Sequence, residues 1–219
     1  MNIYKIIFII FYLCLLVSYF FSETSGNFKR RAINKIALAV SFFSYAVYRY
    51  FFHSEKTAYD TLMLVAILFS AIGDTLLLWS FVKGGISFMV GNLCYAMFFI
   101  LSFKEHPLSR SYYVISFVLF LVLFGFFLYL CRSGFFKIKS YFIPYMMTII
   151  MHGALGFSSM FIESSTRYHL LGIGCFLFMI SDYLIAWHNF RDKENKLILR
   201  LNSGTYFVGM LLIALSIGV

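Results

Sequence analysis

Charge is scarce in this sequence, and its scarcity excludes an ordinary soluble fold. Charged residues make up 12% of the 219 residues, whereas apolar residues make up 62%. A soluble domain has roughly a quarter of its residues charged and is roughly half apolar. No polar stretch is long enough to fold by itself. Residues 1–219 are therefore predicted to form a single integral membrane domain.

Cysteines are also few, and their positions disfavour both a disulfide framework and a metal site. The four cysteines lie inside or at the edge of apolar runs, no CxxC pair is present, and no His/Cys spacing is typical of a metal site. Small apolar residues of membrane helices account for Cys14, Cys94, Cys131 and Cys175 better. The sequence therefore predicts no metal site.

Long apolar runs recur along the whole chain and predict an all-α bundle. Each run has about 20 residues, which is the length of helix that crosses about 30 Å of hydrocarbon. Lipid offers no partner for a free backbone N–H or C=O, so spanning segments must be helical. No signal-peptidase site follows the first run, which we therefore keep as a span. The eight predicted transmembrane helices are 3–21, 32–52, 58–80, 84–103, 112–131, 141–162, 167–189 and 198–218.

Lysine and arginine are distributed unequally between the two sides of this predicted bundle. The side rich in Lys and Arg usually faces the cytoplasm, so both termini are predicted to lie outside, in a multi-pass protein of the bacterial inner (cell) membrane. The basic residues are scattered over short loops, which disfavours nucleic acid as a partner. Of the 18 basic residues, the predicted cytoplasmic side has Lys29, Arg30, Arg31, Lys35, Lys83, Arg132, Lys137, Lys139, Arg191, Lys193, Lys196 and Arg200. The other side has Lys5, Arg49, Lys56, Lys104, Arg110 and Arg167.

Two acids lie well inside the predicted spans. The chain has nine Asp and Glu residues, and all but Asp74 and Asp182 fall in loops or near helix ends. An aspartate at the centre of a membrane helix costs roughly 2.5–3.5 kcal/mol on insertion scales. Such a residue indicates a functional site, and the alternative is a structural acid hydrogen-bonded to a neighbouring helix. The two acids are predicted to lie in the cytoplasmic half of the membrane.

The surroundings of the two aspartates are alike, which indicates an internal duplication. Residues 72–79 read IGDTLLLW and residues 180–187 read ISDYLIAW, and a second match joins SFMVGNLCYA (87–96) to TYFVGMLLIA (205–214). We predict a four-plus-four parallel repeat with halves of about 1–110 and 111–219. A pseudo-two-fold axis along the membrane normal would bring both carboxyl groups to one cavity.

Two carboxyl groups that share a dry cavity do not both stay ionised. Burial and mutual repulsion leave a proton on one of them at neutral pH, while the other acts as a base. A general acid–base pair has this arrangement. A proton relay in a transporter has it too, so the pair alone does not choose between an enzyme and a transporter.

The sequence resembles the YhhN family of membrane proteins, which includes lysoplasmalogenases. The resemblance extends in order through nearly the whole chain, and Lys35 matches a Lys at the start of the family's second helix. The segments that carry it are LFSAIGDTLLL (68–78), GGISFMVGNLCYAMFF (84–99), IPYMMTIIM (143–151), GIGCFLFMISDYLIAWHNF (172–190) and TYFVGMLLIALS (205–216).

The resemblance implies hydrolysis of the vinyl-ether bond of a lysoplasmalogen, a lysophospholipid substrate taken from the lipid bilayer. The products would be a fatty aldehyde and glycerophosphoethanolamine or glycerophosphocholine. This chemistry fits the residues independently, because an enol ether is cleaved by protonating its β-carbon and trapping the resulting cation with water. One carboxylic acid and one carboxylate suffice, as in glycosidases, so no metal and no organic cofactor is required. We assign these roles to Asp74 and Asp182 jointly.

Further polar residues are candidates for binding the substrate. Lys35 could bind a phosphate group, or it could simply reach toward the interface. Serines in membrane helices often serve helix packing instead, and tyrosines often sit at the membrane surface. The remaining candidates are Ser70, Asn92, Tyr95, Tyr145, Ser181 and Tyr206.

Two other functions fit parts of the pattern. A small proton-coupled transporter could use the same aspartate pair, although transporters built from repeats often break helices near the midplane, and here Pro144 alone interrupts a span. An intramembrane aspartyl protease has YD and GxGD on adjacent helices. In this chain Tyr59–Asp60 and Gly73–Asp74 lie on one helix, and Ala71 replaces the first Gly.

Overall fold

The fold is known from a computed structural model, which describes residues 3–52, 59–135 and 142–218. These residues are all-helical and contain no strand. The predicted helices are confirmed to within about one turn at each end. The helices are α1 (Ile3–Glu23), α2 (Phe28–Phe52), α3 (Asp60–Leu77), α4 (Phe81–Phe103), α5 (Ser109–Arg132), α6 (Phe142–Ile162), α7 (Thr166–Phe190) and α8 (Lys196–Leu215).

Seven of these helices are long and apolar enough to cross a membrane, as expected of a multi-pass membrane protein. The exception is α2. It has 25 residues, which is long enough to span, but its first turns carry Lys29, Arg30, Arg31 and Lys35. Charge there lowers the average apolarity of the segment, so the eighth span stays a prediction.

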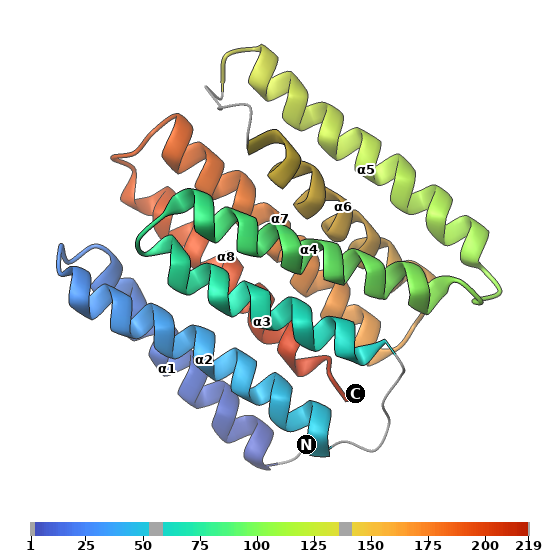
Figure 1. The fold of residues 1–219 in the computed structure, drawn as a ribbon, viewed down its shortest axis with the longest axis horizontal. Coiled ribbons are helices and arrows are strands. Elements are labelled where there is room, and N and C mark those ends of the chain that lie inside the picture. The colour runs from blue at the N-terminus through green and yellow to red at the C-terminus, as the bar shows by residue number, and fades with distance from the viewer. Residues whose placement is uncertain (1–2, 53–58, 136–141, 219) are drawn as a thin grey trace.

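The helices run side by side along one direction (Figure 1). The most extensive contacts join α7 to α8, α3 to α4 and α6 to α7. Helix α6 is the most buried of the seven candidate spans, whereas α5 and α1 are the least buried. In Figure 1 α5 lies at one edge of the bundle and α1 at the other. The core therefore lies between α3, α4, α6, α7 and α8, and the edge helices expose apolar side chains on the outside of the bundle.

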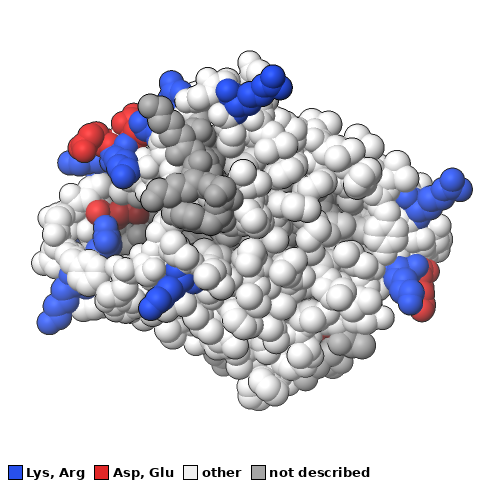
Figure 2. All heavy atoms as spheres, turned by 45° about the horizontal axis from the view of Figure 1, so that its top comes forward, with Lys and Arg blue, Asp and Glu red and all other residues white. Residues whose placement is uncertain are grey.

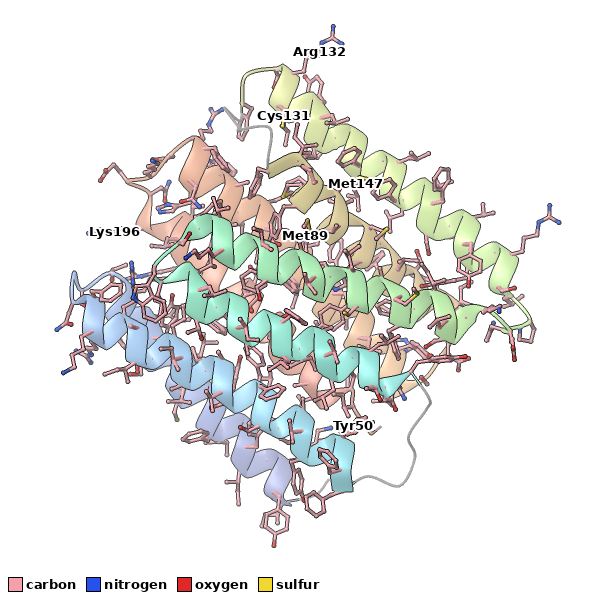
Figure 3. The ribbon with its side chains drawn as sticks, viewed as in Figure 1. Tyr50, Met89, Cys131, Arg132, Met147 and Lys196 are labelled. Carbon is pink, nitrogen blue, oxygen red and sulfur yellow. The ribbon has the colours of Figure 1, made fainter. Side chains whose placement is uncertain are left out.

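Both termini lie at one end of the bundle, opposite the connections α1–α2, α3–α4 and α7–α8 (Figure 1). Figure 2 shows Lys and Arg gathered at two ends of the visible face, with an uncharged band between them. In Figure 3 Arg132 and Lys196 lie at the end with these connections, and Tyr50 lies toward the other. Such a band fits a bilayer, because charged side chains are excluded from hydrocarbon. Of the basic residues used to predict orientation, Lys56, Lys137 and Lys139 lie outside the described residues.

A buried ion pair joins α3 to α7 at the end where the termini lie. The Arg167 guanidinium donates to Asp60 Oδ1 and also lies 5.5 Å from the ring centroid of Phe98. Asp60 opens α3, where a negative charge also suits the helix dipole. The ion pair therefore connects the two helices that carry the central aspartates.

Glycine permits a close helix crossing in the core, between α7 and α8. A Cβ atom on Gly209 would lie 2.8 Å from the carbonyl oxygen of Gly174, and one on Gly174 would lie 2.9 Å from that of Gly209. The matching crossing of α3 and α4 brings Gly91 against Ala66, with a Cβ on Gly91 3.0 Å from the Ala66 carbonyl oxygen. Both crossings use small residues, as is common between membrane helices. The four-plus-four repeat itself stays a prediction.

Replacing Gly209 with Leu is expected to destabilise the bundle by about 1–3 kcal/mol, because the side chain has no room between two backbones. The thermal unfolding temperature in detergent should fall measurably. Gly125 on α5 is the matched control, since a Cβ there would meet nothing within 4 Å. Equal unfolding temperatures for Gly209→Leu and Gly125→Leu would contradict the proposed crossing.

Candidate functional site

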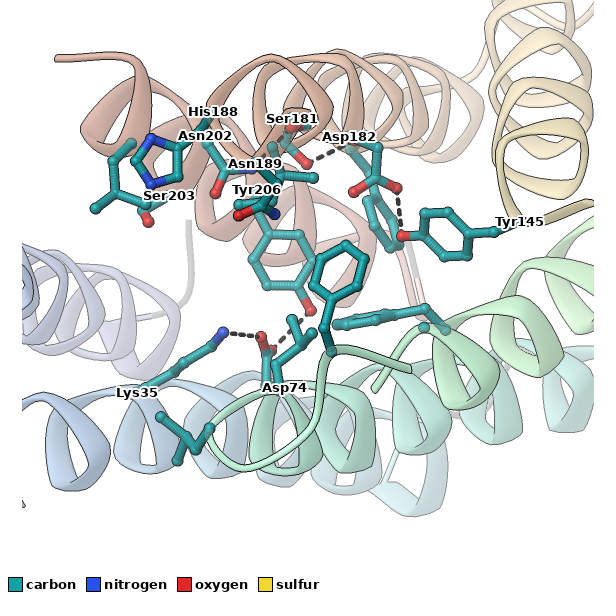
Figure 4. A pocket seen from close by; sticks show the side chains of 18 of the residues that line it. Lys35, Asp74, Tyr145, Ser181, Asp182, His188, Asn189, Asn202, Ser203 and Tyr206 are labelled. Carbon is teal, nitrogen blue, oxygen red and sulfur yellow. Dashed lines mark hydrogen bonds and ion pairs between the residues drawn. The ribbon is translucent and has the colours of Figure 1, made fainter. Parts of the chain in front are cut away.

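A cavity of about 540 Å³ opens among the helices at the end of the bundle where α3 joins α4. Its lining comes from every helix except α5, and it contains both central aspartates. Figure 4 shows Lys35 and Asp74 on one side of this space and Asp182, Ser181 and Tyr145 on the other. The structure therefore places both acids at one cavity, as the sequence predicted.

Asp74 sits in the last turn of α3 and is 1% exposed. Lys35 Nζ of α2 lies 3.4 Å from its Oδ1. The hydroxyl of Tyr206, from α8, donates to its Oδ2 at 2.7 Å. Each oxygen of this carboxyl group thus has a donor from a different helix. The nearby ammonium group favours the ionised carboxylate.

Asp182 sits two turns before the end of α7 and is 5% exposed. The hydroxyl of Tyr145, from α6, donates to its Oδ2 at 2.7 Å. Within the described part of the chain, no cation comes within 4.0 Å of this carboxyl group. Its second oxygen is therefore free to carry a proton, and the two acids have different electrostatic surroundings.

Helix α8 presents a row of polar side chains to the cavity. Asn202, Ser203 and Tyr206 all line it and lie on one face of the helix. Asn202 Nδ2 donates to the carbonyl oxygen of Ser181 at 2.7 Å, which ties α8 to α7 beside Asp182. His188 and Asn189, near the end of α7, also line the cavity.

Aromatic rings separate this cavity from a second group of buried polar side chains. Phe88, Phe178 and Tyr206 line the cavity, and their ring centroids lie 5.1–5.9 Å apart. Behind Phe178 lies His152, whose ring stacks on Tyr95 at 4.8 Å. Polar atoms of Asn92, Tyr95 and His152 are buried there without a hydrogen-bond partner among the described residues.

The outer flank of the cavity is apolar. Val82 and Ile86 of α4 line it and are 47% and 54% exposed on the outside of the bundle. Pro144 of α6 lines it too and is exposed. Gly85 stands between the two α4 residues, and a Cβ there would meet nothing within 4 Å. In a membrane these positions would face lipid chains, so the cavity has a polar interior and an apolar side.

Six of the nine site residues predicted from sequence line this cavity, namely Lys35, Asp74, Tyr145, Ser181, Asp182 and Tyr206. The other three, Ser70, Asn92 and Tyr95, are buried but do not line it. The Ser70 and Ser181 hydroxyls both donate to carbonyls of their own helices rather than to a carboxyl group. Lys35 pairs with Asp74, a contact that neither sequence-based alternative, phosphate binding or reaching toward the interface, had included.

The sequence reasoning missed several polar residues of the lining. They are Tyr19, Glu23, Arg31, His188, Asn189, Asn202 and Ser203. Helical spacing could have indicated some of them, because residues four apart share a face. Tyr19 and Glu23 have this spacing, and so do Arg31 and Lys35. In the described ranges, no three His, Cys, Asp or Glu side chains are grouped so that they could hold a metal ion.

Comparison with known proteins identifies one family. The family described as the YhhN family matches residues 30–217, which is most of the chain. No curated protein and no solved structure matches. The matched region contains both central aspartates and begins after α1.

Proposed function

Because the chain belongs to the YhhN family, we propose that it is a membrane hydrolase that cleaves the vinyl-ether bond of lysoplasmalogens. The products are a fatty aldehyde and glycerophosphoethanolamine or glycerophosphocholine. The observation that carries the proposal is the pair Asp74 and Asp182, two buried acids in different electrostatic surroundings that line one cavity. The reaction consumes one water molecule and needs no cofactor.

The shape and polarity of the cavity support a lysolipid as substrate. The apolar flank formed by Val82, Ile86 and Pro144 would contact the hydrocarbon chain. The cationic groups of Arg31 and Lys35, which also line the cavity, would attract the phosphate. A vinyl-ether bond lies between chain and phosphate in such a molecule, so it would lie near the aspartates.

The two aspartates would divide the chemistry according to their partners. Asp74, with the Lys35 ammonium 3.4 Å away, would act as the ionised carboxylate. Asp182, whose described donor is the neutral Tyr145 hydroxyl, would act as the carboxylic acid. Pairs of carboxyl groups whose surroundings differ in this way are typical of acid–base catalysis.

The catalytic cycle returns both acids to their starting states. Asp182 gives its proton to the β-carbon of the vinyl ether, and the C=C bond becomes an oxocarbenium ion stabilised by the Asp74 carboxylate. Water attacks the cationic carbon while Asp74 takes a proton from it, which forms a hemiacetal. Asp74 then protonates the glyceryl oxygen as the C–O bond breaks, and Asp182 accepts the hydroxyl proton of the hemiacetal. The fatty aldehyde and glycerophosphoethanolamine or glycerophosphocholine then leave.

The test uses purified protein in detergent with 1-alkenyl lysophosphatidylethanolamine. We expect release of a fatty aldehyde. In D₂O the aldehyde should carry deuterium on the carbon next to the carbonyl, because protonation occurs there. Absence of aldehyde from folded protein, with ethanolamine and choline substrates both tested, would overturn the proposal.

Blocking the apolar flank should affect long-chain substrates selectively. Gly85→Trp would place an indole between Val82 and Ile86, where each displaced CH₂ of a lipid chain costs about 0.8 kcal/mol. We expect kcat/KM for a long-chain substrate to fall at least about tenfold, while a short-chain substrate is affected little. Gly125→Trp, on the lipid-facing α5, is the control. An equal loss for both chain lengths would contradict a role for this flank in holding the chain.

For orientation we propose that the cavity faces the cytoplasm in a bacterial inner membrane, with both termini outside. The end of the bundle with the cavity carries Arg132, Arg191, Lys193 and Lys196, and basic loops usually stay in the cytoplasm. Labelling of single cysteines placed beside Lys196 and Arg110 in intact cells would measure this.

A proton-coupled transporter remains the second candidate function. The observation that favours it is the group of unpartnered polar atoms of Asn92, Tyr95 and His152 beyond the aromatic rings of the cavity, because such groups can carry protons deeper into a membrane. All eight helices are continuous within the described ranges, unlike the broken helices frequent in transporters. Proton uptake into vesicles without aldehyde release would favour this function.

A further inference from the structure

Glu23, the last residue of α1, has a buried carboxyl group that is only half satisfied. The Tyr19 hydroxyl donates to its Oε1 at 3.0 Å, and the Ser203 hydroxyl donates to the same oxygen. Its Oε2 is buried and has no hydrogen-bond donor among the described residues. The side chain lines the cavity and the residue is 8% exposed. A buried carboxylate oxygen without a partner is costly, so a donor is expected to enter from the cavity.

The nearest cations do not supply that donor. Arg31 and Lys35, one turn apart on α2, line the same cavity. Lys35 pairs with Asp74, and the Arg31 guanidinium lies 5.7 Å from the ring centroid of Phe28. Neither reaches Glu23 within 4.0 Å in the described structure. The cavity therefore presents two cationic groups beside one carboxylate that lacks an ionic partner.

We propose that Glu23 binds the ammonium group of a zwitterionic lysolipid head group while Arg31 and Lys35 hold its phosphate. The inference rests on the proposed function and adds the head-group preference to it. In such a head group two carbons join a negative phosphate to a positive ammonium. The phosphate complements the cations Arg31 and Lys35, and the ammonium complements the Glu23 carboxylate. Glu23 precedes the region that matches the family, residues 30–217, so the family match does not reach this contact.

The chemistry of the Glu23 pocket selects a primary ammonium over a quaternary one. An ethanolamine ammonium has N–H groups that can donate to Oε2, whereas a choline group has none. Recognition of choline typically uses a cage of aromatic faces. Tyr19 meets Glu23 through its hydroxyl, and the Tyr19 ring packs edge-on against Phe207 at 5.3 Å. Ethanolamine lysolipids should therefore bind more tightly than choline lysolipids.

The test compares three 1-alkenyl lysolipids with the same chain and with ethanolamine, N-acetylethanolamine or choline in the head group. Acetylation keeps the two-carbon link between phosphate and nitrogen, replaces the ammonium with a neutral amide and adds a small acetyl group. For the wild-type protein in detergent, kcat/KM for the ethanolamine lipid is expected to exceed the values for the other two lipids by at least about tenfold. A ratio of this size corresponds to the loss of one charged hydrogen bond. Similar values for all three wild-type reactions overturn the Glu23 proposal.

Glu23→Gln should remove the discrimination between ethanolamine and N-acetylethanolamine to within about threefold, mainly by raising KM for ethanolamine, because that contact acts on binding rather than on the reacting carbon. Glu163→Gln is the control, since Glu163 lies at the other end of the bundle and pairs with His106. Glu163→Gln should keep the preference. A full preference in folded Glu23→Gln overturns the proposal.

A binding readout separates this proposal from the proposed reaction. The saturated 1-alkyl analogues of the three lipids cannot be hydrolysed by protonation of a double bond. Thermal stabilisation of wild-type protein should be larger with the ethanolamine analogue than with the N-acetyl analogue, even if no aldehyde forms from the alkenyl lipids. Preference in binding without hydrolysis would overturn the reaction and support Glu23. Hydrolysis without any head-group preference would support the reaction and overturn the Glu23 proposal.

Discussion

Aldehyde release by Asp182→Asn is expected to be lower than wild type by about 10²–10⁴-fold in kcat, the range that a positioned general acid contributes. The amide is nearly the same size and can still accept the hydrogen bond that the Tyr145 hydroxyl donates at 2.7 Å to Asp182 Oδ2. It cannot transfer a proton to carbon. The loss should therefore fall on kcat, with little change in KM. The measurement is steady-state aldehyde formation from 1-alkenyl lysophosphatidylethanolamine.

The matched control is Asp192→Asn. Asp192 belongs to the connection between α7 and α8 and does not line the cavity, and its Oδ2 accepts a hydrogen bond from Asn195. Asp192→Asn should therefore release aldehyde with the wild-type kcat. Binding of the saturated 1-alkyl analogue should survive in Asp182→Asn, which shows that the cavity is intact. Wild-type kcat in Asp182→Asn would contradict its role as the acid.

Asp74→Asn is expected to reduce kcat by a similar factor for a different reason. The substitution removes the negative charge that would stabilise the oxocarbenium ion and accept a proton from water. It also leaves the Lys35 ammonium, 3.4 Å from Oδ1 in the wild type, with a neutral partner close to a developing cation. Both effects raise the barrier, and electrostatic stabilisation of this kind is often the largest contribution to catalysis.

Lys35→Arg is the informative companion to Asp74→Asn, because it keeps a cation beside the carboxylate. It should retain more activity than Lys35→Met, which leaves a buried carboxylate without its ion pair. Unfolding temperatures of all three variants check that the bundle is intact. Normal turnover by folded Asp74→Asn would contradict the two-carboxylate mechanism, and the remaining explanation would be a structural acid held by Tyr206.

A substrate that enters from the bilayer, as the proposed lysolipid would, would account for a polar wall and an apolar flank in one cavity. The flank of α4 and α6 is exposed on the outside of the bundle at Ile86 and Pro144, whereas the two carboxyl groups lie inside the cavity. A lysolipid would keep its chain in hydrocarbon while its head group reached Arg31. The costly transfer of a long chain through water would then be unnecessary.

The sequence by itself determined the class of the protein and the identity of its central acids. Helices were predictable because hydrocarbon provides no partner for backbone polar groups, so each long apolar run has one stable form. The two intramembrane aspartates were recognisable because their burial is expensive without a function. Helix α2 is the helix for which the apolar pattern indicates a span least clearly, because basic residues in its first turns lower its mean hydropathy.

The tertiary structure alone decided which side chains meet. Lys35 and Tyr206 are far from Asp74 in the chain, yet the rotation and depth of α2 and α8 bring both to its carboxyl group. By sequence Glu23 is one of the acids near a helix end, and only the packing of α1 against α8 brings its carboxyl group to Ser203. Apolar periodicity indicates which face of a helix is buried but not which partner it touches, because that depends on close contacts such as Gly174 against Gly209.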